Sequence, residues 1–398
     1  MNNTFILMHK DIACGLMLID RETGSVRDFR QTEKEHAPFL GNASVEKIKR
    51  WWEARAVPAS RKAMEQIIRA SGSFSPKDYL VKNLGLSMTD CYWLCPLDLE
   101  LEWSRINLFE NAGNVYDAQL PFHHASSFDP NASLGGQMDK YWDLRQSPPA
   151  LVKIAYHDHG QQAVNEAFAS YLHKKQNTEI PFVSYSLEKT EDNGTACICN
   201  SFTNIKTELI PAIEITDSAK CENDTSIYDH YIQICTAHGI DEGMIRDYMD
   251  YQTLTDFIIS NTDEHLMNFG VLRDSETLRL IGPAPLFDSG NSMFYADRRR
   301  IPYQRHELLQ RKITAIHEKE EMMLKHVKNK KIVAADLLPE PEAVMEFYTI
   351  HGIPEEKAAF ITENYRTKCS MLREFQSGKQ ISYYLEKKAQ ITEKSEKV

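Results

Sequence analysis

The pattern of apolar residues changes near residue 220, and this change constrains the fold more than any other feature. Before it, residues 120–215 carry short apolar runs separated by turn-forming residues, which is typical of β-strands. After it, residues 225–385 carry apolar side chains at the spacing of amphipathic helices. We therefore expect an α+β fold in which a small β-rich lobe precedes a larger α-helical lobe.

Individual elements can be placed from these patterns. Strands are expected at 150–156, 182–187, 196–200 and 209–215, and helices at 160–172, 228–237, 242–260, 341–351 and 354–376. Residues 4–30 are expected to form short strands, and a helix is expected after Ser44, whose hydroxyl suits the N-cap position. The expected domains are a short β unit (1–40), a helical region (41–118), a β-rich lobe (119–222), an α-helical lobe (223–386) and a charged flexible tail (387–398).

Composition excludes several classes of protein. The chain has 398 residues and a formal net charge of −11, which disfavours general binding to nucleic acid or anionic membrane. No apolar stretch approaches the roughly 18 residues that span a bilayer, and no secretory signal precedes the first strand. The eight cysteines are dispersed. Cys91 and Cys95 have a metal-like spacing without a matching second pair, so buried thiols are the simpler interpretation. We expect a cytoplasmic protein.

The segment from Asn261 to Gly270, with the sequence NTDEHLMNFG, carries the most specific chemical signal. Asp263 is followed five positions later by Asn268, which is the spacing of a kinase catalytic loop. In such a loop the carboxylate orients a hydroxyl acceptor and takes its proton, and the amide oxygen binds magnesium. Asp263 is therefore the candidate catalytic base, and Asn268 is a candidate magnesium ligand.

A second acidic residue, Asp288, follows an apolar run and precedes the turn Ser289-Gly290. A kinase places its main magnesium ligand at this position, within an Asp-Phe-Gly motif. The strand-like segments 271–273 and 277–281 would form a hairpin that brings Asn268 and Asp288 to one metal pair. Magnesium prefers hard oxygen ligands, so these two residues are the predicted metal ligands.

Two upstream features fit the same order along the chain. Lys153 lies within an apolar strand, where an ammonium group is costly to bury unless it is paired, and Glu166 follows in the next helix. In a kinase this lysine contacts the nucleotide phosphates and a helix glutamate. Ser133, Gly135 and Gly136 belong to an earlier loop whose backbone N–H groups could cradle phosphates. We expect these five residues to contribute to nucleotide binding.

Each signal also has a purely structural interpretation. Asp263 could be a helix-terminal carboxylate, Asn268 a turn residue, and the Asp288 motif an ordinary β-turn. His265 could be a structural histidine, and Lys153 could reach solvent from an edge strand. The order of the motifs favours the catalytic interpretation, because the loop, the lysine, the glutamate and the two acidic motifs follow one another as in kinases.

Taken together, these passages resemble the C-terminal kinase region of the HipA-like serine/threonine kinases. The similar passages cover a little under half of the chain: Ser133–Trp142, Leu151–Lys153, Gln162–Ser170, Asn261–Gly270 and Ala284–Gly290. The resemblance implies a two-lobed protein-kinase-like fold, here with an N-terminal α/β extension. It further implies Mg²⁺ and ATP as cofactors and transfer of phosphate to a Ser/Thr hydroxyl of a protein acceptor.

The resemblance also assigns roles to residues. It implies Asp263 as the catalytic base, Asn268 and Asp288 as magnesium ligands, and Lys153 as the phosphate contact. Ser133 occupies the region where relatives autophosphorylate a serine. Met267 departs from the pattern, because many relatives carry a basic residue directly before the asparagine.

The amino-terminal hundred residues look unlike the toxin members of the family. They contain Trp51, Trp52 and the spaced residues Arg55, Pro58 and Arg61. Some family members act as toxins beside a small DNA-binding antitoxin, so an antitoxin-like regulator is one candidate partner besides the protein acceptor. The first 117 residues are a candidate partner-binding region.

Two alternative functions use the same motifs. One is a pseudokinase or nucleotide-binding regulatory module, against which the intact Asp263, Asn268, Asp288 and Lys153 argue. The other is a kinase that acts on a lipid or small molecule, since phosphatidylinositol kinases share the Asp-x4-Asn spacing. An acidic chain without an evident basic amphipathic helix is poorly suited to an anionic membrane. We expect an ATP-dependent protein serine/threonine kinase.

Overall fold

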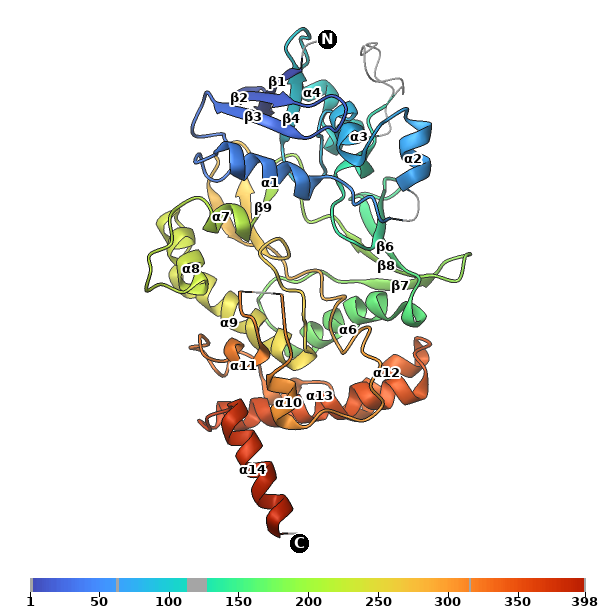
Figure 1. The fold of residues 1–398 in the computed structure, drawn as a ribbon, viewed down its shortest axis with the longest axis vertical. Coiled ribbons are helices and arrows are strands. Elements are labelled where there is room, and N and C mark those ends of the chain that lie inside the picture. Colours follow the sequence, from blue (N-terminus) through green and yellow to red (C-terminus); the bar gives the residue numbers. More distant parts are fainter. Residues whose placement is uncertain (1–2, 62–63, 113–126, 315, 397–398) are drawn as a thin grey trace. The chain divides into compact units, whose positions relative to one another are not determined.

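The computed structural model describes residues 3–61, 64–112, 127–314 and 316–396 (Figure 1). The described residues form a mixed α+β fold, as expected from the sequence, and they contain three sheets. The chain divides into two compact units, of which unit 1 comprises Met1–Lys153, Asn200–Asp224 and Val271–Ile281, and unit 2 comprises Ile154–Cys199, Thr225–Gly270 and Gly282–Val398. Within the described ranges, no helix combines the length and the apolar composition needed to cross a membrane.

Unit 1 begins with an antiparallel sheet of order β3-β2-β1-β4. Its strands are β1 (Thr4–His9), β2 (Ile12–Ile19), β3 (Val26–Gln31) and β4 (Tyr92–Pro96). Alternate side chains of β1 enter two different cores, since Phe5 and Leu7 pack with helix α1 (Val45–Arg55), whereas Ile6 and Met8 pack with Trp93. Both faces of this sheet are therefore covered.

The remaining elements of unit 1 are short. They are α1 (Val45–Arg55), α2 (Met64–Ala70), α3 (Pro76–Lys82), α4 (Trp103–Ile106), α5 (Leu108–Asn111), the 3₁₀ turn η1 (Pro130–Ser133), β9 (Thr207–Pro211) and α7 (Ala212–Thr216). The predicted helix cap at Ser44 is confirmed, because its hydroxyl oxygen accepts a hydrogen bond from the Lys47 amide at 3.4 Å. A second sheet has the order β11-β10-β9, with β10 at Gly270–Asp274 and β11 at Leu280–Pro283.

The third sheet has the order β5-β6-β8-β7. Its strands are β5 (Asp139–Asp143), β6 (Ala150–Ala155), β8 (Thr195–Asn200) and β7 (Ser186–Lys189). Strands β7 and β8 pair antiparallel, with Ser186 opposite Ile198. The division between the two units passes through β6 after Lys153 and through β8 before Asn200.

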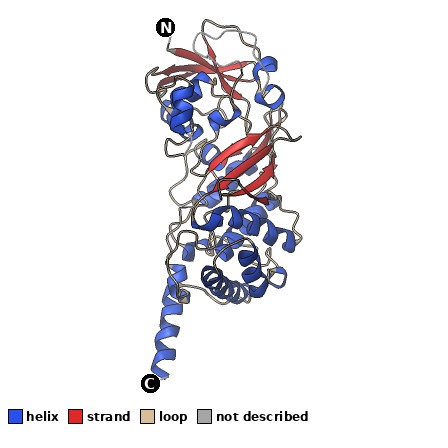
Figure 2. Cartoon of the chain, turned by 90° about the vertical axis from the view of Figure 1, so that its right-hand side faces the viewer, coloured by secondary structure: helices blue, strands red, loops and turns tan. Residues whose placement is uncertain are grey.

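Unit 2 is predominantly helical, as Figure 2 shows by colour. Its helices are α6 (Gln161–Gln176), α8 (Ile227–Ala237), α9 (Glu242–Ile259), α10 (Arg305–Leu309), α11 (Glu320–Met323), α12 (Pro341–Ile350), α13 (Glu355–Gln376) and α14 (Tyr383–Glu396). The ring of Phe168 on α6 lies 5.4 Å from the ring of Tyr348 on α12 and 6.0 Å from that of Tyr365 on α13. These aromatic contacts join the three helices into one core.

Most predicted elements have their counterpart in the structure, but the strand predicted at 182–187 is displaced to Ser186–Lys189. The strand predicted at 209–215 is wrong in its second half. Strand β9 ends at Pro211, and Ala212–Thr216 form the helix α7. Proline has no N–H to donate within a sheet, and its fixed φ suits the start of a helix. The domain boundary predicted at residue 118 lies outside the described residues, and residues 387–396 of the predicted tail belong to α14.

Candidate active site

The end of helix α9 directs the chain into the segment 261–270. Ser260 has a left-handed backbone with a φ of 50°, and the Asn261 amide donates to the Asp256 carbonyl oxygen at 2.9 Å. A left-handed residue at the C-terminus of a helix satisfies the last carbonyls while it turns the chain away from the helix axis. The candidate catalytic loop therefore starts at a fixed point on α9.

The buried side chain of Asn261 organises the start of this loop. Its Oδ1 accepts a hydrogen bond from the Asp263 amide at 3.2 Å. Its Nδ2 donates to Asp256 Oδ1 at 3.1 Å and to Glu264 Oε2 at 3.0 Å. One amide group thus fixes the backbone of Asp263 and connects it to two buried carboxyl groups.

The Asp263 carboxylate is partly exposed and is held from one side. Its Oδ2 accepts a hydrogen bond from Asn291 Nδ2 at 2.6 Å, while its Oδ1 lies 4.0 Å from His265 Nε2. Among the described residues, no hydrogen-bond donor reaches Oδ1. A carboxylate with one oxygen anchored and the other accessible can accept a proton from a hydroxyl that approaches from solvent.

The side chain of Asn268 is hydrogen-bonded to the backbone of Asp263. Its Nδ2 donates to the Asp263 carbonyl oxygen at 2.7 Å, and its backbone N–H donates to the His265 carbonyl oxygen at 2.8 Å. Since the amide nitrogen is committed to this bond, Oδ1 is left as the atom for another partner, and no described residue donates to it. An amide oxygen held in this way suits a hard cation such as Mg²⁺.

Asp288 has a strained backbone with a φ of 65°, which is uncommon for a residue with a side chain. Such strain costs on the order of 1–3 kcal/mol and occurs preferentially at functional sites. The following peptide is fixed, because the Ser289 amide donates to Glu166 Oε2 at 2.9 Å. Both the amide and the hydroxyl of Thr262 donate to the Asn291 carbonyl oxygen, at 3.2 and 3.0 Å, which ties this segment to the catalytic loop.

Helix α6 holds the Asp288 segment with several polar side chains. Asn165 Nδ2 donates to the carbonyl oxygens of Gly290 and Ser292 at 2.8 and 2.7 Å, and its Oδ1 accepts from the Tyr348 hydroxyl at 2.8 Å. These groups are buried, where a satisfied amide is a strong positional constraint. The backbone after Asp288 is therefore as firmly placed as the catalytic loop.

Two buried acids, Asp256 and Glu264, are hydrogen-bonded to Asn261 at the start of the loop. Burial raises the pKa of Asp256 to about 7. Burial, together with repulsion from Asp256 and Asp288, raises the pKa of Glu264 well above its usual value of 4.5. Glu264 accepts a hydrogen bond from the Gln252 amide, and in the described part of the chain no cation pairs with either acid. At neutral pH the pair therefore retains at least one proton.

The structure places the predicted site residues in two groups. Asp263, Asn268, Asp288 and Glu166 belong to unit 2, where the contacts above connect them through Asn291, Thr262 and Ser289. Lys153 belongs to unit 1 and is buried in β6. The predicted contact between Lys153 and Glu166 joins residues of different units and stays a prediction.

Ser133, Gly135 and Gly136 also belong to unit 1. Ser133 is the last residue of η1, and its carbonyl oxygen accepts a hydrogen bond from the Gly135 amide at 3.2 Å. Gly136 has a φ of 85°, which favours glycine. The loop therefore has the tight, glycine-dependent turn expected from its sequence, and its role in nucleotide binding stays a prediction.

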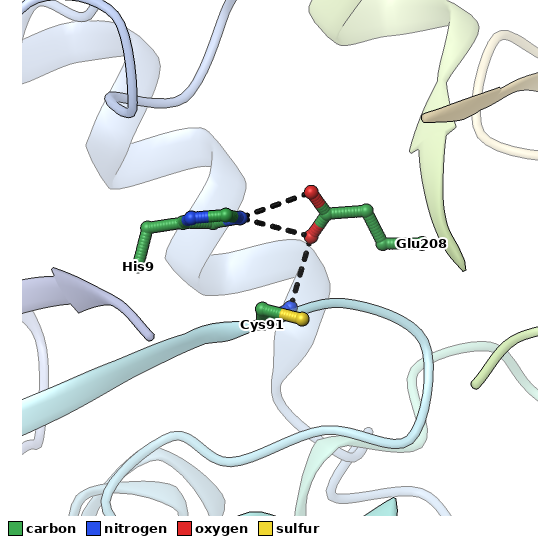
Figure 3. Close-up of side chains that lie close together, drawn as sticks. All are labelled: His9, Cys91 and Glu208. Atoms are coloured by element: carbon green, nitrogen blue, oxygen red, sulfur yellow. Dashed lines mark hydrogen bonds and ion pairs between the residues drawn. The ribbon is translucent and has the colours of Figure 1, made fainter. Parts of the chain in front are cut away.

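Unit 1 contains a second polar cluster that the sequence did not indicate (Figure 3). His9 Nε2 lies 3.0 Å from Glu208 Oε1, and the Cys91 amide donates to Glu208 Oε2 at 3.0 Å. The potential ligand atoms of these three side chains lie within 4.8 Å of one another. Arg273 Nη2, however, lies 2.7 Å from Glu208 Oε1.

The guanidinium of Arg273 determines whether this cluster is a metal site or an ion pair. Burial alone would raise the pKa of Glu208, but Arg273 and His9 outweigh it and lower the pKa to about 2. A permanent cation already neutralises the carboxylate and would repel a metal ion in the same place. We therefore interpret the cluster as a buried ion pair that stabilises unit 1.

Comparison with known proteins gives structural likenesses but no sequence match. No protein-family model matches the sequence, and no curated protein matches it. The structure is similar to the crystal structure of the Helicobacter pylori proinflammatory kinase CtkA, with a TM-score of 0.41 and 13% sequence identity. The match covers 60% of this chain and 97% of that chain.

Proposed function

We propose that the protein is an ATP-dependent kinase that phosphorylates a serine or threonine hydroxyl of a protein acceptor. The observation that carries this proposal is the arrangement around Asp263. Its carboxylate is anchored by Asn291, its carbonyl oxygen is held by Asn268, and its Oδ1 is left for another partner. This arrangement supports a base beside a magnesium ligand, which is the working unit of a kinase catalytic loop.

Each predicted site residue has a separate role in the proposed phosphoryl transfer. Asp263 would orient the acceptor hydroxyl and take its proton as the hydroxyl oxygen bonds to the γ-phosphorus and the bond from that phosphorus to ADP, the leaving group, breaks. Asn268 and Asp288 supply the hard oxygen atoms that would hold Mg²⁺, and Lys153 with the loop at Gly135 would contact the phosphates. Mg-ATP supplies the phosphoryl group and the cation that balances the phosphate charge.

The anchoring contacts of the loop support an active enzyme. Phosphoryl transfer depends mainly on positioning and electrostatics, so its catalytic groups need to be held before substrate binds. Asn261 and Asn165 do this through buried amide groups, and Asn291 does so through a partly buried one. Asp288 adds a strained backbone at the predicted metal ligand.

Transfer of the labelled γ-phosphate of ATP in the presence of Mg²⁺ tests the proposal. Wild type is expected to label itself or proteins of a lysate, whereas Asp263→Asn and Asp288→Asn are expected to lose about a hundredfold or more of the rate. The matched control is Asp336→Asn, which changes an exposed aspartate in unit 2 and is expected to retain full activity.

The outcomes separate the alternatives. Full activity in Asp263→Asn would contradict the assigned role of this carboxylate. Wild type that binds ATP with Mg²⁺ and transfers nothing would indicate a regulatory pseudokinase. Transfer to a supplied lipid or small molecule, without transfer to protein, would indicate a different acceptor class.

A further inference from the structure

Arg61 connects the amino-terminal part of unit 1 to the loop at residues 134–136. Its Nη2 donates to the Gly135 carbonyl oxygen at 2.6 Å and to the Gly136 carbonyl oxygen at 2.8 Å, and it also donates to the Leu134 carbonyl oxygen. Its Nε lies 3.1 Å from the Gly136 carbonyl oxygen. Three consecutive carbonyl groups therefore face one buried guanidinium.

Because the peptide bond is planar, the contact with Arg61 also fixes the direction of the N–H groups on the opposite side of the loop. In a trans peptide the C=O group and the following N–H group point in opposite directions. Carbonyls of Gly135 and Gly136 that face Arg61 therefore direct the N–H groups of Gly136 and Gln137 away from it. Within the described parts of the chain, neither of these two N–H groups donates a hydrogen bond.

The loop is also closely fitted to its surroundings. A Cβ atom on Gly135 would lie 2.4 Å from the Ala54 carbonyl oxygen, so only glycine allows this approach. A Cβ atom on Gly136 would lie 2.8 Å from the Nζ atom of Lys140. Two adjacent backbone N–H groups that both point away from Arg61, with the Lys140 ammonium close to Gly136, suit an oxyanion.

We propose that Arg61 is a positioning residue that presents the amides of Gly136 and Gln137 to the phosphates of a nucleotide. The proposal rests on the proposed function and assigns to the amino-terminal region a part in nucleotide binding. Burial lowers the pKa of Arg61 to about 10, with Asp139 acting in the opposite direction. The guanidinium therefore stays charged at neutral pH, and its contacts to the carbonyls are charge-assisted.

The test compares ligands with and without phosphates. The dissociation constants of Mg-ATP, Mg-ADP and adenosine are measured for wild type, Arg61→Ala and Arg61→Lys. Arg61→Ala is expected to weaken ATP and ADP binding at least about tenfold and to leave adenosine binding unchanged, because the loop amides contact phosphate alone. Arg61→Lys is expected to bind ATP and ADP with an affinity between those of wild type and Arg61→Ala, because an ammonium group cannot reproduce the planar fork of the guanidinium. Arg69→Ala, which removes an exposed arginine from α2, is the control.

The outcomes keep this proposal apart from the proposed function. Equal affinities for ATP in wild type and Arg61→Ala, or an equal loss of adenosine affinity, would overturn the positioning role and leave the kinase proposal standing. Wild type that binds ATP without transferring phosphate would overturn the kinase proposal alone, whereas a lack of any ATP binding would overturn both. If Arg61→Ala does not fold, Gly136→Ala provides the second test, with the same selective loss expected.

Discussion

Each unit of the protein contains a buried polar cluster with at least one carboxyl group, and the two clusters are built differently. In unit 1, Glu208 is surrounded by donors and is neutralised by Arg273, and both Arg273 and His9 contact its Oε1. In unit 2, Asp256 and Glu264 are connected by the amide groups of Asn261 and Gln252, and no cation pairs with them in the described part of the chain. One cluster is satisfied as an ion pair, and the other is satisfied by amides and a retained proton.

The difference distinguishes a buried carboxylate that stabilises the fold from buried acids that belong to a candidate functional site. A buried carboxylate beside a guanidinium keeps its charge and has a lowered pKa, as at Glu208. Buried acids without a cation have raised pKa values and are enriched at functional sites. The unit 2 cluster is joined to Asp263 through the side chain of Asn261, whereas the carboxylate of the unit 1 cluster is paired with Arg273.

The largest expected effect comes from removing the cation of the unit 1 cluster. Arg273→Met leaves the Glu208 carboxylate buried without its main partner, which is expected to lower the free energy of unfolding by about 3–5 kcal/mol. Urea unfolding, followed by a probe in unit 1, measures this change. Arg69→Met in the exposed pair with Glu65 is the control and is expected to cost about 0.5 kcal/mol or less.

A double variant shows whether the loss in Arg273→Met comes from the uncompensated charge. Arg273→Met combined with Glu208→Leu leaves no buried charge behind and is expected to be less destabilised than Arg273→Met alone. A double variant that is as unstable as the sum of both single variants would contradict the ion-pair interpretation of this cluster.

The next largest expected effect is a pH dependence of stability, which arises from the proton that Asp256 and Glu264 retain. The folded-state pKa of Glu264 is raised, so its contribution to stability is fully present below the unfolded pKa of 4.5 and is lost as the pH rises through the folded pKa. Wild type is therefore expected to lose stability relative to Glu264→Gln as the pH rises from 5 to 9. Asp256, Asp288 and Tyr248 face the same group and contribute to this dependence.

Unfolding measured in urea at several pH values checks this prediction. The matched control is Glu346→Gln, which changes an exposed glutamate on α12 and is expected to follow the wild-type pH dependence. Parallel pH profiles for wild type and Glu264→Gln would show that the proton is not held by this pair, and the contrast between the two clusters would then disappear.

A smaller effect is expected at the hydrogen bond that anchors the carboxylate of the candidate base. Asn291→Ala removes the hydrogen bond to Asp263 Oδ2, which as a bond to a charged group contributes about 1.5–2 kcal/mol. If this bond positions the base, kcat for phosphate transfer is expected to fall roughly tenfold, with little change in the KM for ATP. Asn329→Ala, which removes a side-chain bond to Asp247, is the control. An unchanged kcat would show that Asn291 has no part in positioning.

The local features of this site could be predicted from the sequence, but its long-range contacts could not. The five-residue spacing of Asp263 and Asn268 fits the hydrogen bond that the structure has between them. Asn291 reaches Asp263 across 28 residues, and Arg61 reaches Gly136 across 75. Such contacts depend on how the elements pack, and polar residues in loops carry no pattern that indicates their partners.

The buried acids were missed for a related reason. Glu264 stands in a polar segment next to a helix, where a glutamate is normally exposed, and only the packing of α9 against the loop buries it. His9 and Arg273 are 264 residues apart and come together with Glu208 only in the folded unit. The strand predicted at 209–215 failed because the helix-starting preference of Pro211 outweighed the apolar pattern around it.

The smallest expected effect is a null response of the unit 1 cluster to metal ions. His9, Cys91 and Glu208 have metal-like donor atoms, but Arg273 holds the carboxylate, and burial raises the pKa of the Cys91 thiol well above its usual range. A thiol must lose its proton to bind zinc, and here that proton is hard to remove. Added Zn²⁺ or a chelator is therefore expected to leave the Tm unchanged, equally in wild type and in Cys91→Ala. A rise in Tm with Zn²⁺ that Cys91→Ala abolishes would mean that the guanidinium gives way to a cation, and the unit 1 cluster would then be a metal site as well.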